Sequence, residues 1–503
     1  MADFHEKENS MDDKARYFVK TEDIEHVHEL SEKKNSLYEN SEFRETEKRI
    51  VRKFDFLIIP CLFIVFLFSN LDKSNIGNSE TGGMGKDLNL KDNEYGNAVS
   101  LLYVTYVVFE TPVSLSIKSL GPKYLLSVTY LLFGICCLCT SFAVDYHSLL
   151  ACRMLVGLFE SSTIPSIDVI LSMLYTRGEM AKRCSVVYSA AAISGAFGGL
   201  LAFGLLHMDG VANWQGWRWL FAVEGGLSIL GFPVLIILLP HDPRKAWWLS
   251  EKEKAILSVR LEKYDDFHQD EKFSFKEVGR AFRDLNFYLF CSYQICADVT
   301  MFGISTFLPS IIKGMGFTSY STQLMTIPIY FVSYLSFALV GYLSDRFGIR
   351  GIFLIACLSS EVIGYSILVS VDTLGVRYYG CIMIAFGLYV GSGLSLMWLN
   401  NNVAGHYKRA TASGMATTIG NIGGVIVGQI YTSDTAPRYF KGLKITLGLT
   451  CGGILFSSLI LANFYRKNKM HEKILEQLED DGLMTSNDLE IVNDDSPAFK
   501  FLL

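Results

Sequence analysis

Ionisable side chains inside long apolar segments are the residues of this sequence with the clearest chemical potential. Arg153, Gly157 and Glu160 are spaced i, i+4 and i+7, so they would share one face of a helix. An ionised group within a membrane-spanning helix costs about 2.5–3.5 kcal/mol or more, so each is a functional candidate. Arg153 could bind an anionic substrate or set the proton affinity of a neighbouring carboxylate. An internal Arg–Glu structural pair is an equally good interpretation, and the roles can coexist.

A second group of polar residues lies in an earlier apolar segment. Asn70, Lys73 and Gly77 form one stripe, whereas Asp72 and Lys73 are adjacent and therefore point about 100° apart on a helix. Lys73 would lie in the outer half of a membrane, where it either contacts a substrate anion or extends to the outer surface. Asn75 is a further candidate for substrate binding.

A matching stripe is expected in the second half of the chain. Gln294, Asp298, Met301 and Ser305 fall at i, i+4, i+7 and i+11, which is typical of a helix face that borders a cavity. A buried carboxylate that is satisfied by its neighbours gives the same pattern. Ser392 and Ser395, with Asn400–Asn402, could offer neutral hydrogen bonds to a substrate, and Asn421 is a further candidate for substrate binding.

Carboxyl groups are the expected proton carriers if the protein moves protons. All nine histidines lie outside the middle of the apolar segments, so an imidazole in the bilayer core is not expected. A buried carboxyl group holds its proton more tightly than in water and is the physical substitute. The candidates are Asp72, Glu160 and Asp298. Further acids within apolar segments are Glu110, Asp168, Glu224 and Glu361.

The composition indicates a membrane protein. Half of the 503 residues are hydrophobic and only 19% are charged, whereas soluble domains carry about 25% charge. This excludes an ordinary cytosolic enzyme, a disordered chain and a fibrous repeat. The net charge of −6 without a basic stripe argues against nucleic acid as a partner. The chain lacks the motifs G-x-x-x-x-G-K-[ST], H-E-x-x-H and G-x-S-x-G, which argues against an ATP-driven pump or an enzyme.

Long apolar segments that could position these residues number about twelve. Each has the roughly 20 residues that a helix needs to cross a bilayer, and none alternates as a barrel strand would. They predict an all-α membrane protein built as two six-helix bundles, in which 148–174 and 184–206 are each one span. Basic residues in alternate loops place both termini in the cytoplasm. The expected parts are an N-terminal tail (1–53), a first bundle (54–240), a cytoplasmic linker (241–284), a second bundle (285–466) and a flexible C-terminal tail (467–503).

Two smaller patterns add detail. Ser250 and Glu253 predict a capping box that opens a surface helix in the linker. The eleven cysteines lie in or at the ends of apolar segments, so no disulfide framework is expected. The Cys136-Cys137-x-Cys139 cluster could bind a soft metal, but small apolar residues that face lipid or a neighbouring helix are the better interpretation. We therefore expect no metal site.

The most specific motif runs from Gly341 to Arg350. Its glycines would allow close helix approach, and its charged residues could bond to helix ends. The stretch resembles the G-x-L-x-D-R-x-G-x-R loop of the major facilitator superfamily of transporters, where the loop is thought to latch neighbouring helices in one access state. The equivalent loop at 116–123 lacks the Asp-Arg pair. The resemblance implies gating roles for Gly341, Asp345, Arg346, Gly348 and Arg350.

Further stretches resemble one branch of that superfamily, the fungal anion:cation symporters, which include allantoate, nicotinate and pantothenate permeases. The matches fall in order between Phe54 and Tyr465, at 71–78, 153–165, 194–200, 216–225 and 420–424. The resemblance implies a secondary active transporter whose two bundles rock around a midplane site. It also implies proton-coupled symport of a small organic anion. A nutrient sensor that keeps this fold but transports little is the competing hypothesis.

These expectations define the partners. They are a small anionic substrate, protons and the lipid bilayer, with the chain as a monomer, no cofactor, and the proton gradient as the energy source. An inside-negative potential opposes anion entry by about 2.3 kcal/mol per charge per 100 mV, so more than one proton, or one proton with a pH gradient, is needed. The plasma membrane is the default location, and nothing in the sequence excludes the endoplasmic reticulum or vacuole. Nicotinate, pantothenate and allantoate are all compatible substrates.

Overall fold

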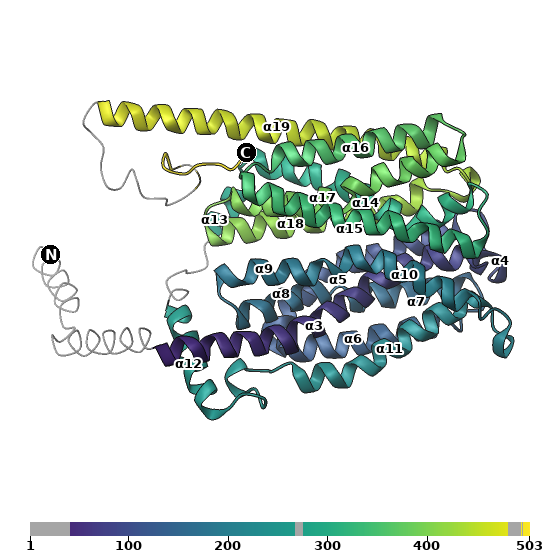
Figure 1. Cartoon of the computed structure of the whole chain (residues 1–503), viewed down its shortest axis with the longest axis horizontal. Helices are drawn as coiled ribbons and strands as arrows, with labels where there is room; N and C mark the ends of the chain where they lie inside the picture. The colour runs from purple at the N-terminus through teal and green to yellow at the C-terminus, as the bar shows by residue number, and fades with distance from the viewer. Residues whose placement is uncertain (1–40, 267–274, 481–493, 495) are drawn as a thin grey trace, which may run out of the picture. The chain divides into compact units, whose positions relative to one another are not determined.

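The computed structural model describes residues 41–266, 275–480, 494 and 496–503 (Figure 1). These residues form helices, turns and loops, and none of them lies in a strand. Within them, 11 helical segments are long and apolar enough to cross a membrane. The predicted all-α membrane protein is therefore confirmed. The remaining predicted span corresponds to α18 (His406–Ile430), which is long enough but carries many polar side chains.

The first bundle is built from the helices before residue 240. They are α3 (Ser41–Thr81), α4 (Met84–Asp87), α5 (Glu94–Leu120), α6 (Pro122–Thr140), α7 (Tyr146–Glu160), α8 (Thr163–Leu174), α9 (Arg177–Tyr188), α10 (Ala190–Leu206) and α11 (Gly216–Leu238). The second bundle contains α14 (Leu285–Lys313), α15 (Ser319–Phe347), α16 (Gly351–Ser370), α17 (Leu374–Asn401), α18 and α19 (Phe440–Asp480). The segment between them holds α12 (Glu251–Asp266) and α13 (Phe275–Ala281).

The fourth and fifth predicted spans are each confirmed as one membrane-crossing stretch, Tyr146–Leu174 and Lys182–Leu206, but each is interrupted by a break between two helices. The fourth is interrupted between α7 and α8, just before Pro165, which has no backbone N–H and whose ring clashes with the carbonyl of residue 161. The fifth is interrupted at Ser189, between α9 and α10. This second break follows Tyr188, whose hydroxyl donates to the Asp168 carboxylate of α8. The second break therefore lies beside a polar contact between the two spans.

The two bundles meet along α5 with α18 and along α10 with α15. A Cβ added at Gly428 would lie 2.1 Å from the Gly96 carbonyl oxygen, and a Cβ at Gly96 would lie 2.1 Å from that of Gly428. A Cβ added at Gly195 would likewise lie 2.4 Å from the Tyr330 ring. Small residues thus permit close helix approach at these positions. Gly414, on the same helix as Gly428, has nothing within 4 Å of a Cβ built there.

Among the described residues, 41–57 and 242–266 form a compact unit of their own. The start of α3 packs on α12 through a Lys53–Glu253 ion pair of 2.7 Å and an edge-on contact between Phe54 and Trp248. The predicted capping box is present, with Ser250 N donating to Glu253 at 2.8 Å and Glu253 N donating to the Ser250 hydroxyl at 3.3 Å. Burial raises the pKa of Glu253, but its bonds to Lys53 and Ser250 outweigh this and hold the pKa below its ordinary value.

Helices continue into both predicted tails. α3 begins at Ser41, inside the tail expected to end at residue 53, and α19 continues to Asp480, beyond the expected boundary at 466. Phe501 is buried against Phe464 of α19, so the described end of the chain packs on the second bundle. The expectation of a flexible tail is therefore wrong for these residues. The rest of the two tails, 1–40, 481–493 and 495, lies outside the described residues, as does 267–274 of the predicted linker.

Candidate functional site

Two ion pairs join α3 to α7 in the middle of the first bundle. Arg153 Nη1 lies 2.7 Å from Asp72 Oδ2, and Lys73 Nζ lies 2.8 Å from Glu160 Oε1. The predicted internal pair between Arg153 and Glu160 is therefore wrong. Those two residues are separated by roughly 10 Å along α7, while Asp72 and Lys73 diverge by about 100° on α3. Each residue of α3 consequently meets a different residue of α7.

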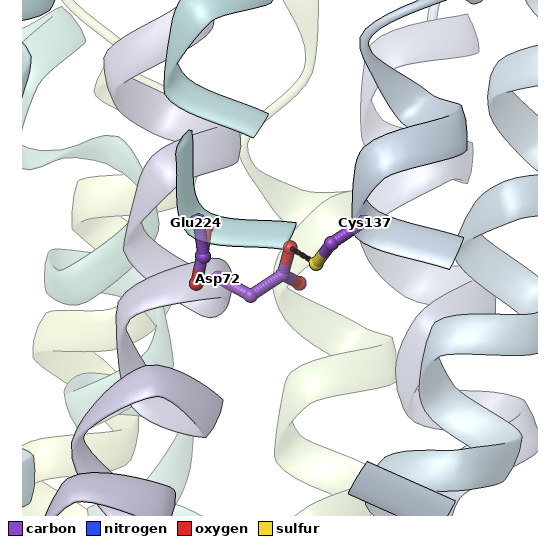
Figure 2. Close-up of side chains that lie close together, drawn as sticks. All are labelled: Asp72, Cys137 and Glu224. Carbon is purple, nitrogen blue, oxygen red and sulfur yellow. Dashed lines mark hydrogen bonds between the residues drawn. The ribbon is translucent and has the colours of Figure 1, made fainter. Parts of the chain in front are cut away.

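Asp72 is the centre of a fully buried cluster. Cys137 of α6 donates its thiol to Asp72 Oδ1 at 3.1 Å, and Asn75 donates to Glu224 Oε2 of α11 at 2.6 Å. Figure 2 shows the Asp72 carboxylate between Cys137 and Glu224, and ligand atoms of these three residues lie within 4.8 Å of one another. The Arg153 guanidinium also stacks over the Phe221 ring at 4.9 Å.

This cluster has the donor types of a metal site but a charge that disfavours one. The Arg153 guanidinium already occupies one oxygen of Asp72, so a metal cation would be repelled by it. Among the described residues, the Oε1 atom of Glu224 has no hydrogen-bond partner. One guanidinium thus faces two carboxyl groups. A proton on one of the two carboxyl groups would make the net charge of this cluster zero.

Lys73 is the more accessible of the two cations. Its side chain is 13% exposed, whereas that of Arg153 is fully buried. Lys73 also lies over the Tyr106 ring, 5.1 Å from its centroid. Its partner Glu160 accepts a second hydrogen bond from the Ser69 hydroxyl. Lys73 could therefore reach an anion by exchanging one partner.

In the second bundle, three predicted substrate-binding residues form one network with Asp298. Gln294 Nε2 donates to Asp298 Oδ1 at 3.0 Å and to the Ser392 hydroxyl at 3.0 Å, and Ser395 donates to Gln294 Oε1 at 2.6 Å. The predicted pattern on α14 thus meets α17. No lysine or arginine among the described residues forms an ion pair with Asp298. Gly420 of α18 covers this carboxylate, since a Cβ there would lie 2.0 Å from Asp298 Oδ2.

Two further residues were predicted to bind substrate. Asn75 belongs to the Asp72 cluster of the first bundle through its bond to Glu224. Asn421 is on α18, and its Nδ2 atom has no hydrogen-bond partner among the described residues. One turn earlier, Thr418 donates to Glu110 of α5 at 3.3 Å, which links the two bundles. The substrate-binding residues predicted from sequence are therefore distributed over both bundles rather than gathered in one cluster.

The gating motif spans the end of α15 and the start of α16. Arg350 Nη2 bonds to Asp345 Oδ1 at 2.7 Å, while Arg346 is exposed. Gly348 ends α15 with a φ of 66°, a conformation that L side chains rarely adopt. Gly341 has nothing within 4 Å of a built Cβ, so the expectation of close helix approach is wrong at that residue.

Sequence reasoning placed Glu224 among the intramembrane acids but did not assign it to a site. Its spacing of i+3 from Phe221 was a usable signal, because the two side chains then share the face of α11 that meets Arg153 and Asp72. Tyr106 beneath Lys73 was not singled out at all. Nothing in the sequence marks an aromatic residue of an apolar helix as the neighbour of a particular cation.

Comparison with known proteins agrees with this architecture. The family model described as Major Facilitator Superfamily matches residues 62–428. The chain is 37% identical over 430 residues to an uncharacterized transporter of Schizosaccharomyces pombe, covering 85% of this chain and 86% of that protein. It is 35% identical over 457 residues to the high-affinity nicotinic acid transporter of Saccharomyces cerevisiae, covering 91% and 85%.

Solved structures share the fold at low sequence identity. A bacterial homolog of the human lysosomal transporter Spinster, in an inward-facing and occupied conformation, matches with a TM-score of 0.64 at 14% identity, covering 82% of this chain and 98% of that one. A D-xylose–proton symporter matches with a TM-score of 0.62 at 14% identity, covering 81% and 97%.

Proposed function

Because the chain belongs to the Major Facilitator Superfamily, and is thus a multi-pass membrane transporter and not an enzyme, we propose that it is a proton-coupled symporter of a small organic anion. The observation that carries this proposal is the Lys73–Glu160 pair, in which a partly exposed anion site and a buried proton site are in direct contact. The similarity to a nicotinic acid transporter supports a carboxylate such as nicotinate, with pantothenate and allantoate as further members of the class.

Protonation of Glu160 couples the two bound species. When Glu160 is ionised, it neutralises Lys73 and competes with an incoming carboxylate. When Glu160 takes a proton, Lys73 loses its charged partner and accepts the substrate anion in its place. Each ligand therefore raises the affinity for the other, which is the thermodynamic requirement for symport.

Other predicted residues have supporting roles in this mechanism. The Arg153–Asp72 pair holds α3 against α7, and Arg153 can bind substrate directly only if that pair opens. Gln294, Ser392 and Ser395 would bind neutral parts of the substrate from the second bundle. Asn421 would offer its side-chain amide from α18. Asp72 and Asp298 are the competing proton carriers.

Alternating access would use the contacts between the bundles. The α5–α18 contact at Gly96 and Gly428 lies on the side that the basic loops predict to be external. It would separate to admit substrate, while the motif at 341–350 would act at the opposite end. We propose a monomer in the plasma membrane, with the endoplasmic reticulum and vacuole as alternatives, and the proton gradient in place of a cofactor.

Uptake measurements test this proposal. Labelled nicotinate, pantothenate and allantoate would be supplied to cells or vesicles at several external pH values, with and without a protonophore. Wild-type protein should accumulate at least one anion more at low external pH, and the protonophore should abolish accumulation. Glu160→Gln should abolish pH-driven accumulation but keep exchange of internal for external substrate. Asp298→Asn is the matching variant of the competing proton carrier in the second bundle.

Each other result has a definite meaning. If Glu160→Gln keeps protonophore-sensitive accumulation, Glu160 is not the carrier. If Asp298→Asn alone loses it, the proton site is in the second bundle. If protein verified in the membrane moves none of the anions but triggers a ligand-dependent cellular response, the symporter proposal fails and the nutrient sensor takes its place.

A further inference from the structure

We propose that the segment made of Asp494 and residues 496–503 occupies a peptide-binding site at the predicted cytoplasmic end of the second bundle. Its binding stabilises the conformation described here, in which the outer ends of α5 and α18 are in contact. The site is formed by the ends of α16, α17 and α18 and by residues 464–468 within α19. The proposal rests on alternating access, which belongs to the proposed function.

The site binds the main chain of consecutive residues. The Leu502 carbonyl accepts from Trp398 Nε1 at 2.8 Å and from Asn402 Nδ2 at 3.0 Å, while Leu502 N donates to Asn402 Oδ1 at 2.6 Å. Phe501 makes the same two-way exchange with Asn468, at 2.8 Å and 2.9 Å. Two asparagine side chains thus each bind both polar groups of one peptide residue, which is the pattern expected of a peptide-binding site.

An apolar anchor accompanies these hydrogen bonds. Phe501 is 2% exposed and stacks on Phe464 of α19, with ring centroids 4.9 Å apart. Phe499 contacts the Phe501 ring edge-on, and Lys467 Nζ lies 5.1 Å from the centroid of the Phe501 ring. Aromatic burial of this kind provides most of the contact area of a peptide anchor. Phe501 is therefore the residue whose position depends most on the site.

The charged contact at the other end of the segment can break without leaving an isolated charge. Lys408 of α18 bonds to Asp494 at 2.5 Å and to Asp284 at 2.9 Å. Burial raises the pKa of Asp284, but the hydrogen bond and charge of Lys408 and the charge of Lys467 outweigh it, so the pKa lies below its ordinary value. If Asp494 leaves, Lys408 keeps Asp284. The segment can consequently bind and dissociate while the bundle remains folded.

The bound segment is linked to the gating motif and to the helices of the site. The Arg350 amide donates to the Leu503 carbonyl at 2.5 Å, and the Arg350 side chain bonds to Asp345. α17 and α18 carry Ser392, Ser395 and Asn421 on the same helices that hold the segment at their cytoplasmic ends. The contacts described above join the segment to helices of the second bundle. Its binding therefore holds the gating residues within that bundle, where they cannot turn toward the first bundle to close the cytoplasmic side.

Spin-label distance measurements test the proposal without a transported substrate. Cysteines at the exposed residues Leu120 of α5 and Ile352 of α16 would report the separation of the cytoplasmic ends of the two bundles, after Cys139→Ser and Cys451→Ser remove the exposed native thiols. The variants are a chain lacking 494–503 and the point variant Asn402→Leu, which removes both bonds to Leu502. Asn401→Leu is the control, because Asn401 is exposed and next in sequence.

Both release variants should increase the population with the shorter label distance, by roughly tenfold for Asn402→Leu, which corresponds to about 1.4 kcal/mol. Asn401→Leu should leave the distribution unchanged. If the label distances are unaltered in both release variants, with or without a lower melting temperature, the segment only stabilises the fold. That result would overturn the proposal. A shift of equal size in Asn401→Leu would overturn it as well. Failure of every anion to be transported would not affect these distances, so it would bear on the proposed function alone.

Discussion

The α5–α18 contact makes a sharp prediction about the outer end of the transporter. Gly428→Ala would add a Cβ that lies 2.1 Å from the Gly96 carbonyl oxygen and 2.4 Å from the Ser100 hydroxyl. The closest obstacle is backbone, so it cannot move aside by rotating a side chain. Ser100 is itself fixed, because its hydroxyl donates to the Val425 carbonyl at 2.8 Å. The added methyl group must separate the two helices.

The size of the effect follows from the cost of overpacking. Forcing one extra carbon into a well-packed contact costs typically about 1–3 kcal/mol. This cost applies only while the outer ends touch, because the methyl group has space once they separate. The ratio of separated to closed molecules should therefore rise by about 5- to 150-fold. The free energy of unfolding should change much less than that of a core variant, since neither bundle's own interior contains the added carbon.

Spin labels on the outer loops provide the assay. Val144, after α6, and Leu374, at the start of α17, are both exposed and would carry the labels in a Cys139→Ser, Cys451→Ser background. Gly428→Ala should increase the population with the longer distance. Gly414→Ala is the matched control on the same helix, because nothing lies within 4 Å of a Cβ there. An unchanged distribution in Gly428→Ala, or an equal change in Gly414→Ala, would refute the packing argument.

Three further predictions concern charge. Arg153→Ala should lower the free energy of unfolding by about 3–5 kcal/mol, because it leaves the Asp72 carboxylate buried and unpaired. Adding Asp72→Asn should restore most of the loss. Thermal unfolding in detergent measures this, and no recovery in the double variant would contradict the pairing. Asp284 has a pKa below its ordinary value, so the stability it contributes is fully present above the pKa of the unfolded state, about 3.9, and is lost as pH falls through the lower folded value. Acid unfolding curves should show this loss in the wild type and not in Asp284→Asn. Uptake of a monovalent anion into vesicles should follow an imposed pH gradient and remain unchanged when a potassium diffusion potential is imposed at constant pH; a clear dependence on that potential would contradict one-to-one coupling.

The number and order of the spans could be predicted because a membrane helix is specified by a local property, the length of its apolar run. The break near Pro165 was also within reach, since proline removes a backbone donor wherever it occurs. The break at Ser189 has no such local cause. The binding of 494–503 was missed for a related reason. An acidic, polar composition predicts a solvated tail, whereas the buried Phe501 ring packs on Phe464 of α19 and holds the end of the tail on the bundle.

The candidate site shows a similar division. The spacing of Gln294 and Asp298 indicated one face of α14, and the structure joins that face to Ser392. The partners of Arg153 could not be predicted, because a charge pattern along α7 does not reveal which helix packs beside it. Spacing within one helix fixes a direction for each side chain, while the identity of the facing residue depends on contacts between segments far apart in sequence.

Charge balance within the first bundle explains why the proposed coupling would be one to one. Asp72, Glu160 and Glu224 bring three carboxyl groups to the two cations Lys73 and Arg153. If Glu224 keeps a proton, the empty group is neutral. A bound proton on Glu160 together with a monovalent anion on Lys73 is neutral again, whereas either ligand alone leaves a net buried charge. Burying an unpaired charge costs several kcal/mol, so the singly loaded forms would seldom pass through a closed, water-free intermediate. The empty and doubly loaded forms would pass readily, and because each carries no net charge, the pH gradient and not the membrane potential would drive uptake.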